Sequence, residues 1–92
     1  MKNVLKKAVF LDRDGILNKL VNNRPPWIVE EVDFFDEVYE IIKLIKENKF
    51  LPIVVTNQPD AARGNANFNS IKEVQTYICN HLKINHKYTC YH

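Results

Sequence analysis

The sequence predicts an α/β fold in which a parallel sheet lies between layers of helix. Two short apolar runs, 7–11 and 51–56, each end abruptly at polar residues, which is typical of strands buried on both faces of a parallel sheet. Between them, apolar side chains recur at helical spacing over 36–48, so strand, helix and strand follow in the order of a βαβ unit. At 92 residues the chain is shorter than a typical domain of ~100–150 residues. We therefore expect residues 1–92 to be one part of a single domain with a three-layer architecture.

The helix predicted over 36–48 has one apolar face and two recognisable ends. Asp36 is the expected N-cap, because its side chain can accept a hydrogen bond from the first helical turn. Since no glycine follows this helix, Asn48 is expected to adopt the left-handed conformation that ends many helices. The apolar face is formed by residues at positions i, i+3, i+4 and i+7: Val38, Ile41, Ile42 and Ile45.

A second helix is expected over 70–82, followed by the start of a third strand over 87–92. Residues 16–35 contain Pro25-Pro26 and are expected to form an irregular excursion over the edge of the sheet. Trp27 is interpreted as the packing anchor of this excursion, with stacking on a substrate as the alternative. The apolar face of the second helix comprises Ile71, Val74, Ile78 and Leu82.

Composition and charge argue against several classes of function. The sequence is 46% hydrophobic and 26% charged, which is typical of globular proteins and not of disordered ones. A net charge of +2 does not indicate a nucleic-acid or membrane-surface partner. The apolar runs are too short for a transmembrane helix or a signal peptide, so we expect a cytoplasmic protein. In that reducing compartment the two cysteines are expected to remain thiols.

Polar residues follow both predicted strands at the point where each strand ends. The first strand is followed by Asp12-Arg13-Asp14-Gly15, and the second by Thr56-Asn57-Gln58-Pro59 with Arg63 further along the same loop. Each pattern alone is typical of a turn or a helix cap. Because ligands of open α/β sheets bind outside the carboxyl ends of the strands, both patterns together predict one site with two carboxylates, a hydroxyl and a guanidinium.

This set of residues suits phosphoryl transfer through a carboxylate nucleophile. One aspartate attacks phosphorus to form an aspartyl-phosphate, and the other protonates the leaving oxygen and then activates water. A hard cation such as Mg²⁺ would offset the repulsion between two acids and a phosphate. Thr56 and the amides after it would hold the non-reacting phosphate oxygens, and Arg63 would bind a phosphate elsewhere in the substrate.

The two patterns resemble motifs of the haloacid dehalogenase (HAD) superfamily of phosphatases. Its first motif is similar to Val9-Phe10-Leu11-Asp12-Arg13-Asp14-Gly15. Its second motif, in the form used by subfamily IIIA, is similar to Val54-Val55-Thr56-Asn57-Gln58-Pro59-Asp60 with Ala62-Arg63-Gly64. Within this subfamily the resemblance is to the branch of heptose 1,7-bisphosphate phosphatases and histidinol-phosphatases, and it runs from residue 7 to the last residue.

The resemblance implies a Rossmann-like fold of the HAD type and a role for each motif residue. It implies that Asp12 is the nucleophile and a Mg²⁺ ligand, and that Asp14 is the general acid/base, whose main-chain carbonyl also binds Mg²⁺. It further implies that Cys90 and His92 are the first two ligands of a structural Zn²⁺. Phosphate and substrate contacts are implied for residues of the second motif: Thr56, Asn57, Gln58, Pro59 and Arg63.

The sequence departs from the family after the second motif. The third motif of these phosphatases, a Lys or Arg beside the nucleophile, and the fourth, acidic residues that complete the Mg²⁺ site, are missing, as are the other zinc ligands. The resemblance therefore implies the N-terminal half of a hydrolase of carbohydrate metabolism that acts on a small sugar bisphosphate. We expect the 92 residues alone to be inactive, to bind Mg²⁺ weakly and to self-associate through the open edge of the sheet. The alternatives are a histidinol-phosphatase and a non-catalytic remnant of such a phosphatase.

Overall fold

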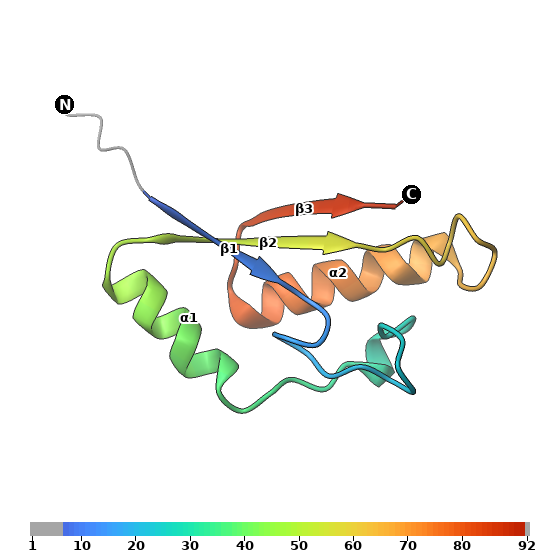
Figure 1. Cartoon of the computed structure of the whole chain (residues 1–92), viewed down its shortest axis with the longest axis horizontal. Helices are drawn as coiled ribbons and strands as arrows, with labels where there is room; N and C mark the ends of the chain where they lie inside the picture. Colours follow the sequence, from blue (N-terminus) through green and yellow to red (C-terminus); the bar gives the residue numbers. More distant parts are fainter. Residues whose placement is uncertain (1–6, 92) are drawn as a thin grey trace.

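The computed structural model describes residues 7–91, in which three parallel strands form a sheet with two helices packed against it (Figure 1). The strand order is β1-β2-β3, with α1 connecting the first pair and α2 the second. The predicted parallel α/β fold is confirmed. In chain order the elements are β1 (Ala8–Asp12), a short 3-10 helix η1 (Val29–Glu31), α1 (Val38–Glu47), β2 (Leu51–Asn57), α2 (Phe68–Leu82) and β3 (His86–Cys90).

Both helices cover the same face of the sheet, as Figure 1 shows. Right-handed crossovers that advance in one direction across a sheet place successive helices on the same side. Of the three layers expected from the sequence, residues 7–91 therefore form two, a sheet and one helical layer. The core lies between them and consists of Leu17, Val38, Ile42, Val54, Val74, Ile78, Cys79, Leu82 and Ile84.

Strand β1 is buried on one face only, so the prediction of a strand buried on both faces is wrong. Its exposure alternates: Val9 and Leu11 are half-buried, and Phe10 between them is 66% exposed. The central strand β2 is instead buried over most of its length. A short apolar run does not reveal this difference, because the elements that cover a strand come from distant parts of the chain.

The ends of α1 differ from the prediction. The helix begins after Glu37 and no side chain caps it, so Asp36 is not the N-cap. Beyond its last turn Lys49, with a φ of 63°, adopts the left-handed conformation that was expected of Asn48. Ile41, expected on the apolar face, is 43% exposed.

Helix α2 matches the prediction more closely, and its expected apolar face is buried. Its N-cap is Asn67, whose side-chain oxygen accepts a hydrogen bond from the main-chain N–H of Ser70 at 3.1 Å. Neither helix described within residues 7–91 is long and apolar enough to cross a membrane.

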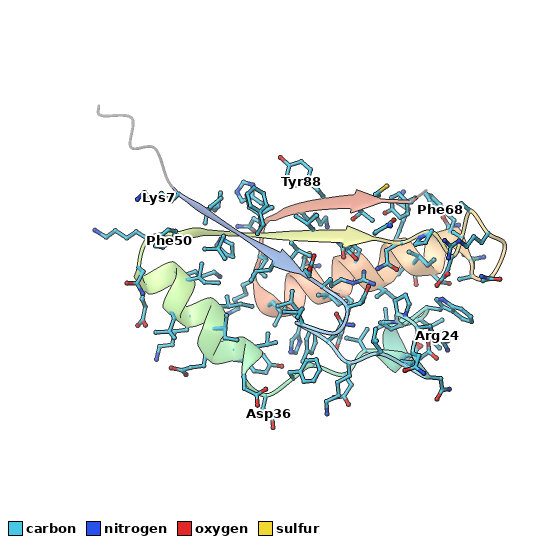
Figure 2. All side chains as sticks on the ribbon, viewed as in Figure 1. Lys7, Arg24, Asp36, Phe50, Phe68 and Tyr88 are labelled. Carbon is cyan, nitrogen blue, oxygen red and sulfur yellow. The ribbon has the colours of Figure 1, made fainter. Side chains whose placement is uncertain are left out.

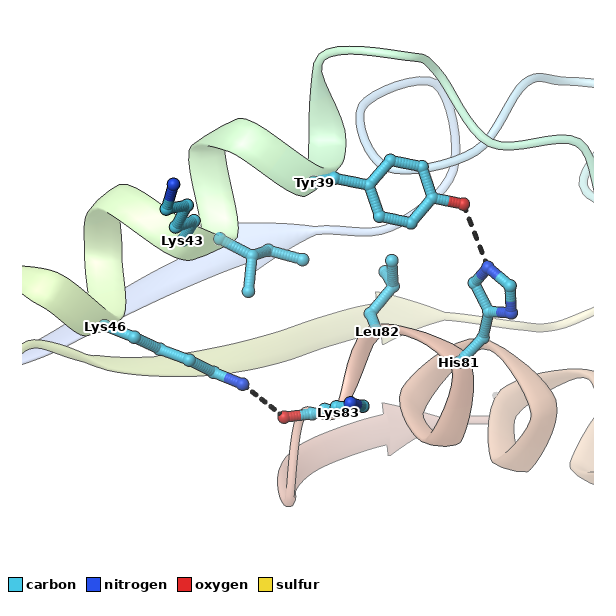
Figure 3. A pocket seen from close by; sticks show the side chains of 7 residues that line it. Tyr39, Lys43, Lys46, His81, Leu82 and Lys83 are labelled. Carbon is cyan, nitrogen blue, oxygen red and sulfur yellow. Dashed lines mark hydrogen bonds between the residues drawn. The ribbon is translucent and has the colours of Figure 1, made fainter.

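A groove between α1 and the end of α2 is crossed by two hydrogen bonds (Figure 3). The Lys46 ammonium donates to the main-chain carbonyl of Lys83 at 2.7 Å. The Tyr39 hydroxyl and Nε2 of His81 lie 2.9 Å apart. These two hydrogen bonds therefore connect α1 to the end of α2, and the polar groups that form them are paired with each other.

Candidate active site

The chain leaves β1 through a tight turn that begins at Arg13. The carbonyl of Arg13 accepts hydrogen bonds from the N–H groups of Ile16 and Leu17, the latter at 2.8 Å. Gly15 has a φ of 85°, a conformation that residues with a side chain rarely adopt. Its N–H donates to the carbonyl of Asn18 at 2.7 Å, which closes the turn beside the carboxyl end of the sheet.

The carboxylate of Asp14 is held by four neighbouring side chains. Arg13 donates to both of its oxygens, from Nε at 2.9 Å and from Nη2 at 3.0 Å. Asn18 donates to Oδ1 at 3.0 Å, and Gln58 donates to Oδ2. The Thr56 hydroxyl lies 3.4 Å from Oδ2. These contacts from two loops and a strand fix the orientation of this carboxylate.

The guanidinium of Arg13 connects this site to the helical layer. Arg13 is 1% exposed, and its Nη1 donates to Oε1 of Gln75 on α2 at 3.0 Å. A buried charge requires such partners, and the two-point pair with Asp14 supplies the opposite charge. From the sequence, the guanidinium of the site was expected to come from Arg63. No local signal pointed to Arg13, because its partner on α2 is 62 residues away in the sequence.

The carboxylate of Asp12, in contrast, is exposed and accepts no hydrogen bond from the described residues. Asp12 lines two hollows, one over the face of the sheet opposite the helices and one at the strand ends. We name the former face, on which Figure 2 shows Tyr88, the open face. Asp12 is the last residue of β1 and pairs in register with Val55 of β2. Asp12 is therefore the acid of this site whose carboxylate is exposed at both hollows.

The hollow at the strand ends has a volume of about 160 Å³ and is mostly polar. It brings together four of the predicted site residues from two strand ends, as expected from the sequence. It is lined by Asp12, Arg13, Asp14, Val55, Thr56 and Asn57.

The other predicted residues of the second motif lie around this hollow without lining it. Gln58 is fully buried, and its side chain donates to the Thr56 hydroxyl at 2.7 Å as well as to Asp14. Pro59 and Arg63 lie in the loop after β2, where the main-chain N–H of Arg63 donates a hydrogen bond to the carbonyl of Pro59 at 3.0 Å. The Arg63 side chain is exposed.

The predicted zinc ligands lie at the end of β3. Cys90 is exposed and pairs in register with Asn57, and its carbonyl accepts a hydrogen bond from the main-chain N–H of Gln58 at 2.6 Å. His92 lies outside the described residues. Within residues 7–91 there is no group of three or more His, Cys, Asp or Glu side chains arranged to hold a metal ion. The zinc site therefore stays a prediction.

The excursion over 16–35 packs against the loop after β2 through Trp27. The indole Nε1 donates to Oδ2 of Asp60, a buried residue, at 2.8 Å. The Arg24 guanidinium stacks on the indole, 3.7 Å from its centre, and forms a two-point ion pair with Glu31. The pKa of Glu31 is lowered to about 2, mainly by the hydrogen bonds that its carboxylate accepts from Arg24. The second cause is the hydrogen bond from the main-chain N–H of Trp27. Trp27 is thus a packing anchor, as expected, and Arg24 is committed to Glu31.

No family model matches the chain. The chain is, however, similar in sequence to several heptose-1,7-bisphosphate phosphatases. Over 58 residues the chain is 34% identical to a D-glycero-α-D-manno-heptose-1,7-bisphosphate 7-phosphatase of Campylobacter jejuni, covering 63% of this chain and 33% of that protein. Over 59 residues it is 39% identical to a D-glycero-β-D-manno-heptose-1,7-bisphosphate 7-phosphatase of Haemophilus ducreyi, covering 64% and 31%. The resemblance to heptose bisphosphate phosphatases is confirmed. An uncharacterised protein of Methanocaldococcus jannaschii is 42% identical over 55 residues, covering 60% of this chain and 56% of that protein.

Two solved structures share the fold. A D,D-heptose 1,7-bisphosphate phosphatase from B. bronchiseptica, complexed with magnesium and phosphate, superposes with a TM-score of 0.80 at 20% identity. It covers 94% of this chain, which corresponds to 50% of that protein. A HAD-like phosphatase from Mesorhizobium loti has a TM-score of 0.81 at 24% identity, covering 95% and 43%. The fold is therefore HAD-like, and the chain spans about half or less of these structures and matches about a third of the two curated phosphatases.

Proposed function

We propose that this chain supplies the nucleophile side of a phosphatase site that hydrolyses a phosphomonoester of a small sugar bisphosphate, of the heptose 1,7-bisphosphate type. The observation that carries the proposal is the contrast between two acids at one hollow. Asp12 is exposed and has no hydrogen bond or ion pair with any residue of 7–91, which suits a nucleophile, whereas Asp14 is held in a fixed orientation by Arg13 and its neighbours. The kinship with heptose bisphosphate phosphatases supports the same reaction and substrate class.

In the proposed mechanism the Asp12 carboxylate attacks the phosphorus of the substrate. A bond forms between an Asp12 oxygen and phosphorus, and the bond from phosphorus to the sugar oxygen breaks. The carboxyl group of Asp14 transfers its proton to the leaving sugar oxygen. A water molecule then attacks the aspartyl-phosphate while Asp14 removes its proton, which releases phosphate and restores Asp12. To transfer a proton, Asp14 must exchange one of its present hydrogen bonds for one to the reacting oxygen.

The hollow at the strand ends is the proposed phosphate site. The Thr56 hydroxyl and the Asn57 side chain, which both line this hollow, would donate hydrogen bonds to the non-reacting phosphate oxygens. The side-chain amide of Gln58 positions Thr56 and Asp14 by donating hydrogen bonds to both. Arg63, exposed in the loop after Pro59, would bind the second phosphate of a bisphosphate substrate.

Magnesium fits the donor set at the strand ends, but this chain supplies few ligands for it. The Asp12 carboxylate and the main-chain carbonyl of Asp14 are oxygen donors of the kind that Mg²⁺ prefers, out of about six that it needs. When bound there, the ion would offset the charge of the substrate phosphate. We therefore expect weak Mg²⁺ binding by residues 1–92 alone, measured by calorimetry. Tight binding of one ion per chain would contradict this.

The zinc half-site and the location in the cell are also proposals. Cys90 and His92 would contribute two of the four ligands that a structural Zn²⁺ site needs. We further propose that the protein works in the cytoplasm on a small phosphorylated metabolite, without a nucleic-acid or membrane partner, given its net charge of +2.

A chimera tests the proposed reaction without requiring the 92 residues to act alone. In it, residues 7–91 replace the overlapping half of the B. bronchiseptica phosphatase, and hydrolysis of heptose 1,7-bisphosphate is assayed with Mg²⁺. We expect activity that falls by at least about 10²–10³-fold in Asp12→Asn, because that change removes the nucleophile. The matched control is Asp33→Asn, an exposed carboxylate that forms a surface ion pair with Lys19 at 3.5 Å.

The same assay separates the alternatives. Faster turnover of histidinol phosphate than of the sugar bisphosphate would favour a histidinol-phosphatase. A chimera that folds, as judged by circular dichroism, but hydrolyses neither substrate would favour a non-catalytic remnant. Activity that survives Asp12→Asn would show that another residue is the nucleophile.

A further inference from the structure

Arg13 lines the hollow at the strand ends, yet its guanidinium is already occupied by the protein. An arginine beside a phosphate-sized hollow often binds the phosphate directly. Here the residue is 1% exposed, and each of the three nitrogen atoms of the guanidinium donates a hydrogen bond to a neighbouring side chain. The guanidinium therefore holds side chains of the site in place and does not face a substrate.

The position of the guanidinium is determined from two sides. Its ion pair with Asp14 joins adjacent residues of one turn, and a long, flexible arginine side chain is not fixed by such a neighbour alone. Its far end is held from α2, where Nη1 donates to Oε1 of Gln75 at 3.0 Å. Because the guanidinium is planar, the contacts of Nη1, Nε and Nη2 together determine both its place and its plane.

Gln75 is a polar residue on the buried face of α2. It is 2% exposed and shares that face with Ile71, Val74 and Ile78. Burial of an amide is unfavourable unless the amide forms hydrogen bonds. Its Oε1 accepts the bond from Arg13, whereas its Nε2 has no hydrogen-bond partner within residues 7–91. The contact with Arg13 is therefore the interaction that offsets the burial, and a hydrogen-bond acceptor is what this position requires.

We propose that Gln75 is a positioning residue for the carboxylate of Asp14 and acts on it through Arg13. The inference rests on the proposed function, in which Asp14 transfers the proton. Asn18 and Gln58 each donate to one oxygen of this carboxylate. Arg13 donates to both oxygens and therefore sets the plane of the carboxyl group. Proton transfer depends on that geometry, and a displacement of ~1 Å can cost about 10²-fold in rate.

Two variants of Gln75 in the chimera described above test the proposal. Gln75→Met removes the acceptor at similar side-chain length, whereas Gln75→Glu keeps an acceptor oxygen. We expect Gln75→Met to lower kcat at least about tenfold and to leave KM within about twofold, because the acid acts in the transition state and not in substrate binding. Gln75→Glu should keep kcat within about threefold. The matched control is Ile78→Val, which removes one methyl group from a fully buried side chain of the same helix and should change neither constant.

A second measurement reports on Arg13 without requiring activity. Its Nε–H is buried and bonded to Asp14, so it should exchange slowly with solvent, as measured by NMR of isotope-labelled protein, either residues 1–92 or the chimera. The signal is assigned by its loss in Arg13→Lys. Gln75→Met should speed the exchange at least about tenfold, and Gln75→Glu and Ile78→Val should leave it slow.

Several results would overturn the proposal. One is exchange that stays slow in Gln75→Met, because Arg13 would then be held without Gln75. Another is faster exchange with an unchanged kcat, or a raised KM in place of a lowered kcat. Equal losses of kcat in Gln75→Met and Gln75→Glu would show that the acceptor is not what matters.

Two further cases remain decidable. If Gln75→Met does not fold, Gln75→Asn takes its place, because its acceptor is one carbon too short to reach Arg13. A chimera that folds but hydrolyses no substrate would contradict the proposed function. The Nε–H exchange would then decide by itself whether Gln75 holds Arg13 against Asp14.

Discussion

The two faces of the sheet differ in what their side chains contact, although the same three strands supply both. On the helical side Val54 is fully buried against Ile78 and its neighbours, whereas Phe10 and Tyr88 on the other side are mostly exposed. The difference extends into the candidate site. Asp12 lies over the open face, and the next residue, Arg13, is buried and bonded to α2. The helical side therefore contains the core, and the other side carries the exposed carboxylate of Asp12, the proposed nucleophile.

The largest effect is expected from a truncation in the helical layer. Ile78→Ala removes a fully buried side chain from the core and should lower the free energy of unfolding by about 2–5 kcal/mol. Urea unfolding measures the loss. Ile41→Ala on α1 is the matched control, because Ile41 is 43% exposed and should lose far less. Equal losses would show that burial between the sheet and the helices is not what makes Ile78 stabilising.

A smaller but still substantial effect is expected where the site is tied to the helical side. Arg13→Gln breaks the buried pair with Asp14 and should cost about 3 kcal/mol of unfolding free energy, because the carboxylate loses its cationic partner. Lys19→Gln breaks an exposed ion pair of 3.5 Å and should cost less than about 0.5 kcal/mol. Thermal unfolding of both variants distinguishes the two cases, and similar losses would contradict a special role for the Arg13 contacts.

A pH dependence is expected from the ion pair of the excursion. Arg24 lowers the pKa of Glu31 from 4.5 to about 2, so the pair stabilises the folded chain above about pH 4.5 and this contribution is lost as the pH falls toward 2. Glu31→Gln should therefore lower Tm near neutral pH and have progressively less effect in acid. The effect is small because solvent reaches the pair. A Tm difference that stays constant down to acidic pH would refute the assignment.

The smallest effect is expected on the open face. Phe10→Ala should change the unfolding free energy of the isolated chain by less than about 0.5 kcal/mol, because the side chain is 66% exposed. A buried phenylalanine would lose about 3–5 kcal/mol on the same change. Urea unfolding at low protein concentration checks this. A large loss would indicate that the open face is already covered in solution.

Much of the candidate site could be predicted because the strands of a parallel sheet end at one edge. The apolar runs predict β1 and β2, and the polar residues after them had to meet there, which places Asp12, Asp14 and Thr56 together. The apolar spacing of α2 likewise predicts its buried face, since helical geometry alone determines which residues share a side.

The tertiary structure alone decided which of these local features meet. The contact between Arg13 and Gln75 spans 62 residues, and that between Trp27 and Asp60 spans 33, so neither has a local signal. The one-sided burial of β1 is of the same kind, because its apolar run is compatible with cover on either face. Sequence patterns report the preferences of neighbouring residues, whereas the packing of distant elements determines which of those preferences are satisfied.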